Sequence, residues 1–141
     1  MSNKIVMRYG AQPNYDREEE GGGETVTTLW ANADPTSSFA AQTITLSDLA
    51  TNYKKLRIEV YRSDGNYTVD YDMAGADKFY SSSSTGRMCI CAKSADNTNI
   101  YSRYIYFNGG YDKLYISNGA RWNAAATSSN IAKPAVIYGV N

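Results

Sequence analysis

Apolar and polar residues alternate along much of the chain, and this period of two is typical of half-buried β-strands. The cleanest alternation runs over residues 55–62 (KLRIEVYR), whose apolar side chains share one predicted face: Leu56, Ile58 and Val60. Asp64-Gly65 follows, a dipeptide that supplies the positive φ angles of a tight hairpin turn. Residues 67–73 then alternate again, so the two segments are predicted to pair as a β-hairpin.

The same pattern predicts further strands at residues 24–30, 42–46, 87–93, 100–107, 113–117 and 135–140. The strand at 87–93 is mostly apolar and is predicted to lie centrally in its sheet. Between the strands, residues 74–86 and 123–130 are predicted loops, and residues 47–52 are predicted to form one short helical turn. About eight or nine short strands without a long helix predict an all-β fold, an antiparallel β-sandwich or jelly-roll-like domain.

The N-terminal part of the chain breaks this pattern. Residues 16–24 (DREEEGGGE) contain four glutamates, three consecutive glycines and no apolar residue, which is the composition of a flexible, solvated linker. Ahead of it lies an apolar stretch with four residues suited to a contact: Ile5, Val6, Met7 and Tyr9. Two interpretations stay open, a first strand or ragged terminus of the domain, and a short extended arm that docks onto a neighbouring subunit. The expected organisation is an arm and linker over residues 1–24 and a β-sandwich domain over residues 25–141.

Length and charge narrow the class of protein. The 141 residues fit one domain with one core. Fourteen basic residues balance fourteen acidic ones, and a neutral chain is not expected to bind nucleic acid or an anionic membrane, because both require a basic surface. Glycans and other protein subunits remain open as partners. No apolar run reaches membrane-spanning length, and the first residues lack the hydrophobic core of a secretory signal.

Composition also limits the chemistry. Because the chain has no histidine, it has no Ser-His-Asp or Cys-His centre and no imidazole metal ligand. Cys89 and Cys91 lie two residues apart on one strand face, too widely spaced for a comfortable disulfide, and one pair cannot close a zinc site. They are predicted to be small, buried, reduced side chains. We therefore expect no metal and no cofactor.

A catalytic role finds little support in the sequence. Asp70 and Asp72 share a strand face, and a pair of carboxylates is what glycoside hydrolysis uses. The alternation of that strand, however, predicts a solvated polar face there without any catalytic role. Trp30 and Trp122 are predicted to be core or end residues of the sandwich rather than platforms for sugars. No catalytic residue is assigned, and the chain is not expected to be an enzyme.

The strand at residues 100–107 contains the best candidate contact surface. Thirteen tyrosines are present in the chain, and tyrosine offers a broad ring with a polar tip. Tyr101, Arg103, Tyr104 and Tyr106 could stack sugars or nucleobases. Tyr101 shares one predicted face with Arg103, and Tyr104 shares the other with Tyr106. One of these faces must be core, so about half of the cluster is expected to be structural.

Three passages resemble a known family. They are residues 28–46 (TLWANADPTSSFAAQTITL), residues 53–61 (YKKLRIEVY) and residues 134–140 (PAVIYGV). Their order resembles that of β-sandwich domains in phage and prophage virion structural proteins, often from Gram-positive hosts. It consists of a strand ending in Leu-Trp, an Asn-x-x-Pro-x-x-x-Phe loop, a Gln-Thr-Ile strand and a closing Pro-x-x-Ile-Tyr-Gly strand. The resemblance covers residues 25–141 and is strongest at the two ends.

This resemblance implies a location more than an activity, since a shared fold does not fix function. It implies a tail-fibre tip, baseplate or head-fibre and capsid-decoration module, generally a homotrimer, assembled in the bacterial host cytoplasm and carried on the virion. Because only about two dozen residues precede the domain, a short appendage is expected whose arm docks to a capsid, connector or tail protein. The alternative is a host-receptor module that binds a surface glycan and serves host attachment.

Overall fold

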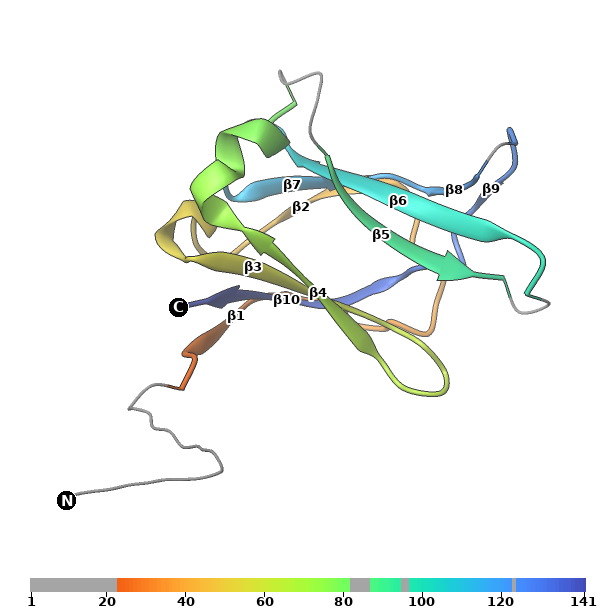
Figure 1. Ribbon diagram of the computed structural model, residues 1–141, viewed down its shortest axis with the longest axis horizontal. Coiled ribbons are helices and arrows are strands. Elements are labelled where there is room, and N and C mark those ends of the chain that lie inside the picture. The colour runs from red at the N-terminus through yellow and green to blue at the C-terminus, as the bar shows by residue number, and fades with distance from the viewer. Residues whose placement is uncertain (1–22, 82–86, 95–96, 123) are drawn as a thin grey trace, which may run out of the picture.

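The computed structural model describes residues 23–81, 87–94, 97–122 and 124–141 of the chain. Two antiparallel β-sheets pack face to face around one core, and short 3-10 helices close one end (Figure 1). The predicted all-β antiparallel fold is therefore confirmed. None of the helices in these ranges is long and apolar enough to cross a membrane.

The first sheet has four strands in the order β1-β10-β3-β4. These are β1 (Val26–Ala31), β10 (Pro134–Val140), β3 (Lys55–Val60) and β4 (Tyr67–Asp72). The predicted hairpin is present, because Lys55 pairs with Asp72 and Val60 pairs with Tyr67 across β3 and β4. The first and last strands of the domain, β1 and β10, are hydrogen-bonded neighbours, so the two ends of the domain meet in this sheet.

The second sheet has six strands, and β6 (Ile100–Phe107) lies at its centre. One side of β6 pairs with β7 (Lys113–Ile116) and β8 (Gly119–Arg121), which lead on to β2 (Gln42–Thr45) and β9 (Thr127–Ser128) respectively. The other side of β6 pairs with β5 (Met88–Lys93). Because β5 has no second partner strand in the described residues, it is an edge strand, and its predicted central position is wrong.

The core lies between the two sheets and explains the alternation in the sequence. Every second side chain of β3 and β7, and of β6 from Arg103 onward, points inward and is buried, while the residues between them are exposed or half-buried. Each fully buried aliphatic or aromatic side chain contributes on the order of 2 kcal/mol to folding. The large apolar side chains that are fully buried are Leu56, Ile58, Val60, Met88, Ile90, Ile105, Phe107, Leu114, Ile116, Ile137 and Val140.

Two tyrosines close the gap between the edge strands β4 and β5. The Tyr71 hydroxyl accepts a hydrogen bond from the Cys89 N–H at 3.0 Å and donates to the Cys89 carbonyl oxygen. The Tyr67 hydroxyl donates to the Cys91 carbonyl oxygen. An open strand edge presents unpaired backbone groups to other chains. These hydroxyls satisfy part of the β5 edge and join the two sheets along one side of the sandwich.

One glycine is required by close packing. A Cβ atom on Gly139 of β10 would lie 2.5 Å from the ring of Tyr53, so no larger residue fits without moving that ring. The Tyr53 hydroxyl in turn donates to the Asp48 carboxylate at 2.9 Å, which fixes the ring over the glycine. This contact gives a physical reason for the Tyr-Gly pair in the closing strand.

Irregular segments account for the remaining differences from the predicted elements. The short helical turn is present as η2 (Ala50–Asn52). The predicted loop after β4 begins instead with η3 (Met73–Phe79), where the Asp72 carboxylate accepts a hydrogen bond from the Ala74 N–H. The short strands β8 and β9 were predicted as turn and loop, because strands of two or three residues have too little alternation to detect.

Candidate functional site

Three tyrosines form a continuous aromatic surface on the outer face of the six-stranded sheet. We call Tyr104, Tyr106 and Tyr115 the tyrosine platform. Tyr106 of β6 lies directly opposite Tyr115 of β7, and Tyr104 is two residues from Tyr106 along the same face of β6. Tyr104 is 46% exposed, and the neighbouring residues of β6 are buried in the core. The alternation of two adjacent strands therefore places these rings together on the outside.

The rings of the tyrosine platform are in mutual contact. The centroids of Tyr106 and Tyr115 are 5.0 Å apart, and those of Tyr104 and Tyr115 are 6.4 Å apart. The Tyr104 and Tyr106 rings are nearly parallel, with an interplanar angle of 7° and a centroid distance of 6.2 Å. Burial, together with the nearby Tyr104 and Tyr106 phenols, raises the pKa of Tyr115 above its usual value. The Tyr115 phenol is therefore neutral at physiological pH.

A cation borders the tyrosine platform. The guanidinium carbon of Arg87, immediately before β5, lies 4.2 Å from the centroid of the Tyr106 ring. This is a cation–π contact, in which the planar guanidinium is held against the ring. Arg87 also donates to the Tyr80 carbonyl oxygen at 3.4 Å. The Tyr106 ring and the Tyr80 backbone therefore both contact this guanidinium.

Charge is distributed unequally between the two sheets. The strands of the six-stranded sheet contain no aspartate or glutamate, but they contain four basic residues: Lys93, Arg103, Lys113 and Arg121. The strands of the four-stranded sheet contain three acidic and two basic residues: Glu59, Asp70, Asp72, Lys55 and Arg57. Of the four basic residues, however, Arg103 is buried, and Lys113 binds Asp112, which precedes β7, at 3.1 Å.

On the outer face of the four-stranded sheet, charged side chains bind one another in ion pairs. Arg57 binds Asp70 through two hydrogen bonds of 2.7 and 2.8 Å, and it also binds Glu24 at 3.1 Å. Lys55 binds Glu24 at 2.8 Å. Hydrogen bonds from these cations lower the pKa of Glu24 and of Asp70. This face satisfies its charges internally, which leaves the tyrosine platform as the more open of the two outer faces.

Arg103 was predicted as a possible surface contact residue, and the structure contradicts this prediction. Its side chain is 0% exposed and lies on the inner face of β6, so it cannot contribute to a surface contact. It donates hydrogen bonds to four backbone carbonyl oxygens, those of Phe39, Ser117, Ser129 and Ile131, at 2.8 to 3.0 Å. Burial lowers the pKa of Arg103 to about 10, which still leaves it charged near neutrality. Arg103 therefore joins three loops at the end of the sandwich.

The other predicted contact residues divide between the two faces. Tyr104 and Tyr106 lie together on the outer face, whereas Tyr101 is half-buried and lies on the same side of β6 as Arg103. Sequence reasoning missed Tyr115 and Arg87. The signal for Tyr115 was present, because the Asn-Gly-Gly turn between the two predicted strands sets a hairpin register that brings Tyr115 opposite Tyr106.

The tryptophans behave differently from each other. Trp30 packs against the core and makes an edge contact with Phe39 at 6.0 Å, as predicted. Trp122 is 75% exposed, so of its two predicted places, in the core or at an end of the sandwich, the core is wrong. It follows β8 and accompanies Ile100, which is 51% exposed, at the end of the outer face away from the tyrosine platform. This end of the sheet carries isolated aromatic and aliphatic side chains.

The cysteines are also placed differently from the prediction. Cys89 and Cys91 are both free and exposed, because β5 is an edge strand whose outer face is not covered. Cys89 lies directly opposite Tyr104 of the platform, and Cys91 lies opposite Ser102. The described residues contain no cluster of three or more His, Cys, Asp or Glu that could hold a metal ion.

The two candidate carboxylates of β4 have structural partners. Asp70 is paired with Arg57, and hydrogen bonds from that guanidinium lower the pKa of the Asp70 carboxyl. Asp72 caps η3. A general acid in glycoside hydrolysis needs a raised pKa, so Asp70 has the opposite of the required property.

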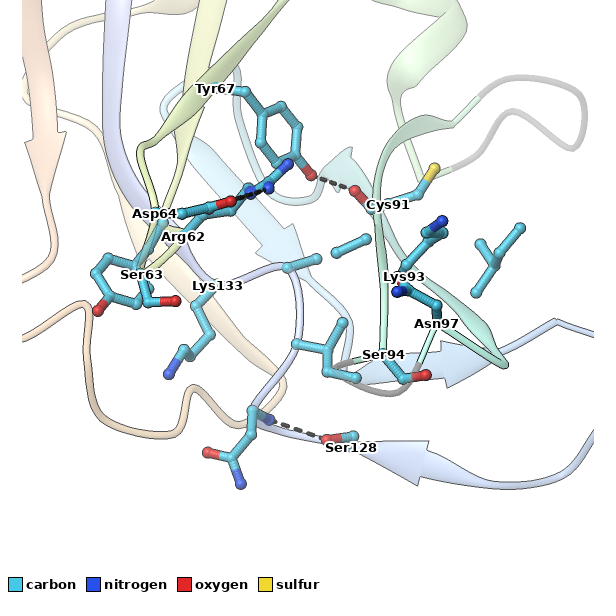
Figure 2. A pocket seen from close by; sticks show the side chains of 16 residues that line it. Arg62, Ser63, Asp64, Tyr67, Cys91, Lys93, Ser94, Asn97, Ser128 and Lys133 are labelled. Carbon is cyan, nitrogen blue, oxygen red and sulfur yellow. Dashed lines mark hydrogen bonds and ion pairs between the residues drawn. The ribbon is translucent and has the colours of Figure 1, made fainter.

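An open cleft of about 1140 Å³ lies at the other end of the sandwich (Figure 2). It is bordered by the β3–β4 turn, the end of β5 and the segment between β9 and β10. Several of its polar groups already have partners: Arg62 binds Asp64 at 2.6 Å, and the Lys133 ammonium donates to the Thr36 carbonyl oxygen at 2.8 Å. The cleft therefore offers fewer available groups than the tyrosine platform.

The predicted arm at Ile5, Val6, Met7 and Tyr9 lies outside the described residues. Comparison of the chain with protein-family models, with curated proteins and with solved structures gave no match.

Proposed function

We propose that this chain is a bacteriophage virion structural protein, a small head-fibre, capsid-decoration or tail-associated appendage. In this proposal the N-terminal arm docks to a capsid, connector or tail protein, and the β-sandwich is displayed from the particle. The domain acts by contact rather than by catalysis, and its copies associate as a homotrimer. Symmetric copies combine several weak contacts into a stable attachment.

The observation that carries the proposal is that the two outer faces differ in their exposed side chains. Ion pairs close the outer face of the four-stranded sheet, whereas the six-stranded sheet exposes the tyrosine platform beside Arg87. Exposed clusters of aromatic rings are typical of surfaces that contact another molecule. Such a division favours a display module whose function lies on one face.

The resemblance to phage structural domains adds support of a different kind. The passages that carry it include β1, β10 and β3, which are consecutive strands of one sheet, and β2 of the other sheet. Three of the four strands in these passages are therefore neighbours in the fold. Gly139 of the last passage packs against Tyr53, which begins the middle passage.

Deletion of residues 2–23 tests the assembly role. Glu24 is kept, because it binds Lys55 and Arg57 in the domain. We expect the shortened protein to fold, with an unchanged unfolding midpoint, and to be lost from purified particles. A second variant replaces Ile5, Val6, Met7 and Tyr9 by serine, and its matched control replaces Glu18, Glu19 and Glu20 by glutamine. Normal occupancy of the serine variant in particles would disprove docking through the arm.

The alternative function is a host-receptor module that binds a surface glycan during attachment. The tyrosine platform favours it specifically, because the exposed Tyr104 ring offers an aromatic surface that can contact a sugar ring. A glycan array with the purified full-length chain separates the two functions. Binding to no glycan, together with loss of the arm-deleted protein from particles, would leave the structural role alone.

A further inference from the structure

We propose that the copies of the homotrimer meet through the outer face of the six-stranded sheet, with the tyrosine platform turned toward their shared axis. This inference rests on the proposed function and adds the surface through which the copies associate. The molecule that covers the tyrosines is therefore another copy of this chain. Docking of the arm to a particle protein is measured separately, so the two proposals can fail independently.

The outward residues around the tyrosine platform are uncharged in three successive rows across the sheet. In the first row, Thr43 of β2 lies opposite Tyr115, and Tyr115 lies opposite Tyr106. In the second row, Tyr104 lies opposite Cys89 of β5. The third row contains four small side chains from four neighbouring strands: Cys91, Ser102, Ala120 and Thr127. We call the residues of these three rows the neutral face.

The charged side chains at the margin of the neutral face are held by other groups or lie beyond its rows. Lys113 of β7 binds Asp112 at 3.1 Å, so this pair adds no net charge. The Arg87 guanidinium lies over one ring of the tyrosine platform. Lys93 lies opposite Ile100, past the third row. An identical neutral face can therefore approach without repulsion between like charges within the three rows.

The composition of the neutral face is typical of a contact between protein subunits. The centres of such interfaces are depleted in charged residues and enriched in tyrosine. Tyr104 is 46% exposed, and Cys89 and Cys91 are both free and exposed. Tyrosine supplies a large contact area with little loss of side-chain entropy. Contact with another copy would remove these side chains from water, and burial of their apolar surface favours association.

The outer face of the four-stranded sheet fits a contact between copies less well. Lys55 and Arg57 bind the carboxylates of Glu24 and Asp70 on that face. Burial of these ion pairs in an interface would cost the desolvation of each charged group. The neutral face carries no such cost within its three rows, and it is the better of the two outer faces for self-association.

Association by strand addition at the β5 edge is also disfavoured. The Tyr71 hydroxyl binds both the N–H and the carbonyl oxygen of Cys89, and the Tyr67 hydroxyl binds the Cys91 carbonyl oxygen. A strand added at this edge needs the same backbone groups and would have to displace both hydroxyls. Contact through the neutral face leaves these hydrogen bonds in place.

A saccharide would cover only a small part of the neutral face. The third row crosses four strands, which span about 14 Å at the usual spacing between strands. A sugar ring stacked on Tyr104 would leave the first and third rows uncovered. Arg87 already lies against the ring of Tyr106. Other copies of the chain can cover all three rows at once, which makes them the better occupant of this surface.

Sedimentation velocity of the full-length chain over a wide range of concentrations tests the proposal. Thr43→Lys and Tyr104→Lys each place a cation on the neutral face of every copy, at side chains that are exposed in the single chain. We expect the unmodified chain to sediment as a trimer and both variants as monomers with unchanged circular dichroism spectra, because their like charges repel. The matched control is Thr68→Lys, at an exposed position of β4 in the other sheet, which should remain trimeric.

The outcomes separate this inference from the proposed function. A trimer that persists in both neutral-face variants would show that the copies meet elsewhere, which overturns the inference while the homotrimer stands. A monomeric or dimeric unmodified chain would overturn the homotrimer and the inference together, whereas docking is still decided by the arm variants in particles. A monomer that binds a glycan and loses that binding in the Tyr104→Lys variant would assign the face to host attachment instead.

Thiol labelling tests directly whether the neutral face is covered. Cys89 and Cys91 belong to the neutral face and are exposed in the single chain. We expect a bulky maleimide to label them roughly tenfold or more slowly in the unmodified trimer than in the Thr43→Lys variant, because thiol reaction requires access. That substitution lies on β2, which β6 and β7 separate from β5. The Thr68→Lys control should label as slowly as the unmodified chain, and equal rates in trimer and monomer would overturn the inference.

Discussion

Replacement of Arg103 by methionine removes a buried cation that holds three loops to the six-stranded sheet. The guanidinium donates to the carbonyl oxygens of Phe39, Ser117, Ser129 and Ile131 at 2.8 to 3.0 Å. Methionine fills a similar volume but donates no hydrogen bond. All four carbonyl groups would then lose their donor, and those within the core could not be solvated without local opening.

The expected loss of stability is about 3–5 kcal/mol. Hydrogen bonds from a charged donor contribute roughly 1.5–3 kcal/mol each, so four of them set an upper limit near 6–12 kcal/mol. The desolvation of the guanidinium, which costs several kcal/mol, is relieved in the variant and offsets part of this loss. That desolvation is also the reason that the pKa of Arg103 falls to about 10. Arg103→Lys keeps the charge but not the planar fork, so we expect a smaller loss of about 2–3 kcal/mol.

Urea unfolding followed by tryptophan fluorescence and circular dichroism measures these differences from the midpoint and the slope. The matched control is Arg121→Met, which removes a cation of the same sheet and should change stability by less than about 0.5 kcal/mol. If Arg103→Met costs less than about 1 kcal/mol, the four carbonyl contacts do not stabilise the loops as argued, and Arg103 returns to the candidates for a surface role.

Three further substitutions test other parts of the fold. Gly139→Ala places a Cβ atom 2.5 Å from the ring of Tyr53, so we expect a loss of about 2–4 kcal/mol from overpacking and displacement of that ring, read as a lower urea midpoint. Burial raises the pKa of Tyr71 to about 12, whereas an unfolded tyrosine ionises near 10. The folded state therefore holds this proton more tightly, and the resulting stability is present below pH about 10 and is lost as the pH rises towards 12. Tyr71→Phe should reduce this alkaline loss; an unchanged slope in unfolding midpoints between pH 9 and 12 would contradict it. Trp122→Ala, at a side chain 75% exposed, should leave the midpoint within about 0.5 kcal/mol of the original chain.

Local pattern predicted most of the strands because alternation and turn chemistry are properties of short segments. The hairpin over β3 and β4 is the clearest case, since its buried residues Leu56, Ile58 and Val60 follow directly from the period of two. The same reasoning separated Tyr104 and Tyr106 from Tyr101 and Arg103. It could not decide which of these two faces points into the core, because that depends on how the sheets pack.

The features missed by the sequence are set by contacts between distant residues. Arg103 is buried because Phe39, Ser117, Ser129 and Ile131, from 14 to 64 residues away in sequence, provide its acceptors. A basic residue between two tyrosines gives no sign of such partners. The exposure of Cys89 and Cys91 has a similar origin, since an apolar strand becomes an edge strand only through the topology of the whole sheet.

The two sheets balance their charges in different ways. Like charges on one face repel, so stability favours a mixture of acidic and basic residues there. The chain achieves such a mixture on the four-stranded sheet, where Glu24 and Asp70 neutralise Lys55 and Arg57. On the six-stranded sheet, Arg103 is instead buried against four backbone carbonyl oxygens, and Lys113 binds Asp112, which precedes β7, at 3.1 Å. The charge of an outer face therefore depends on burial and on neighbouring loops, and the residues of the strands alone do not determine it.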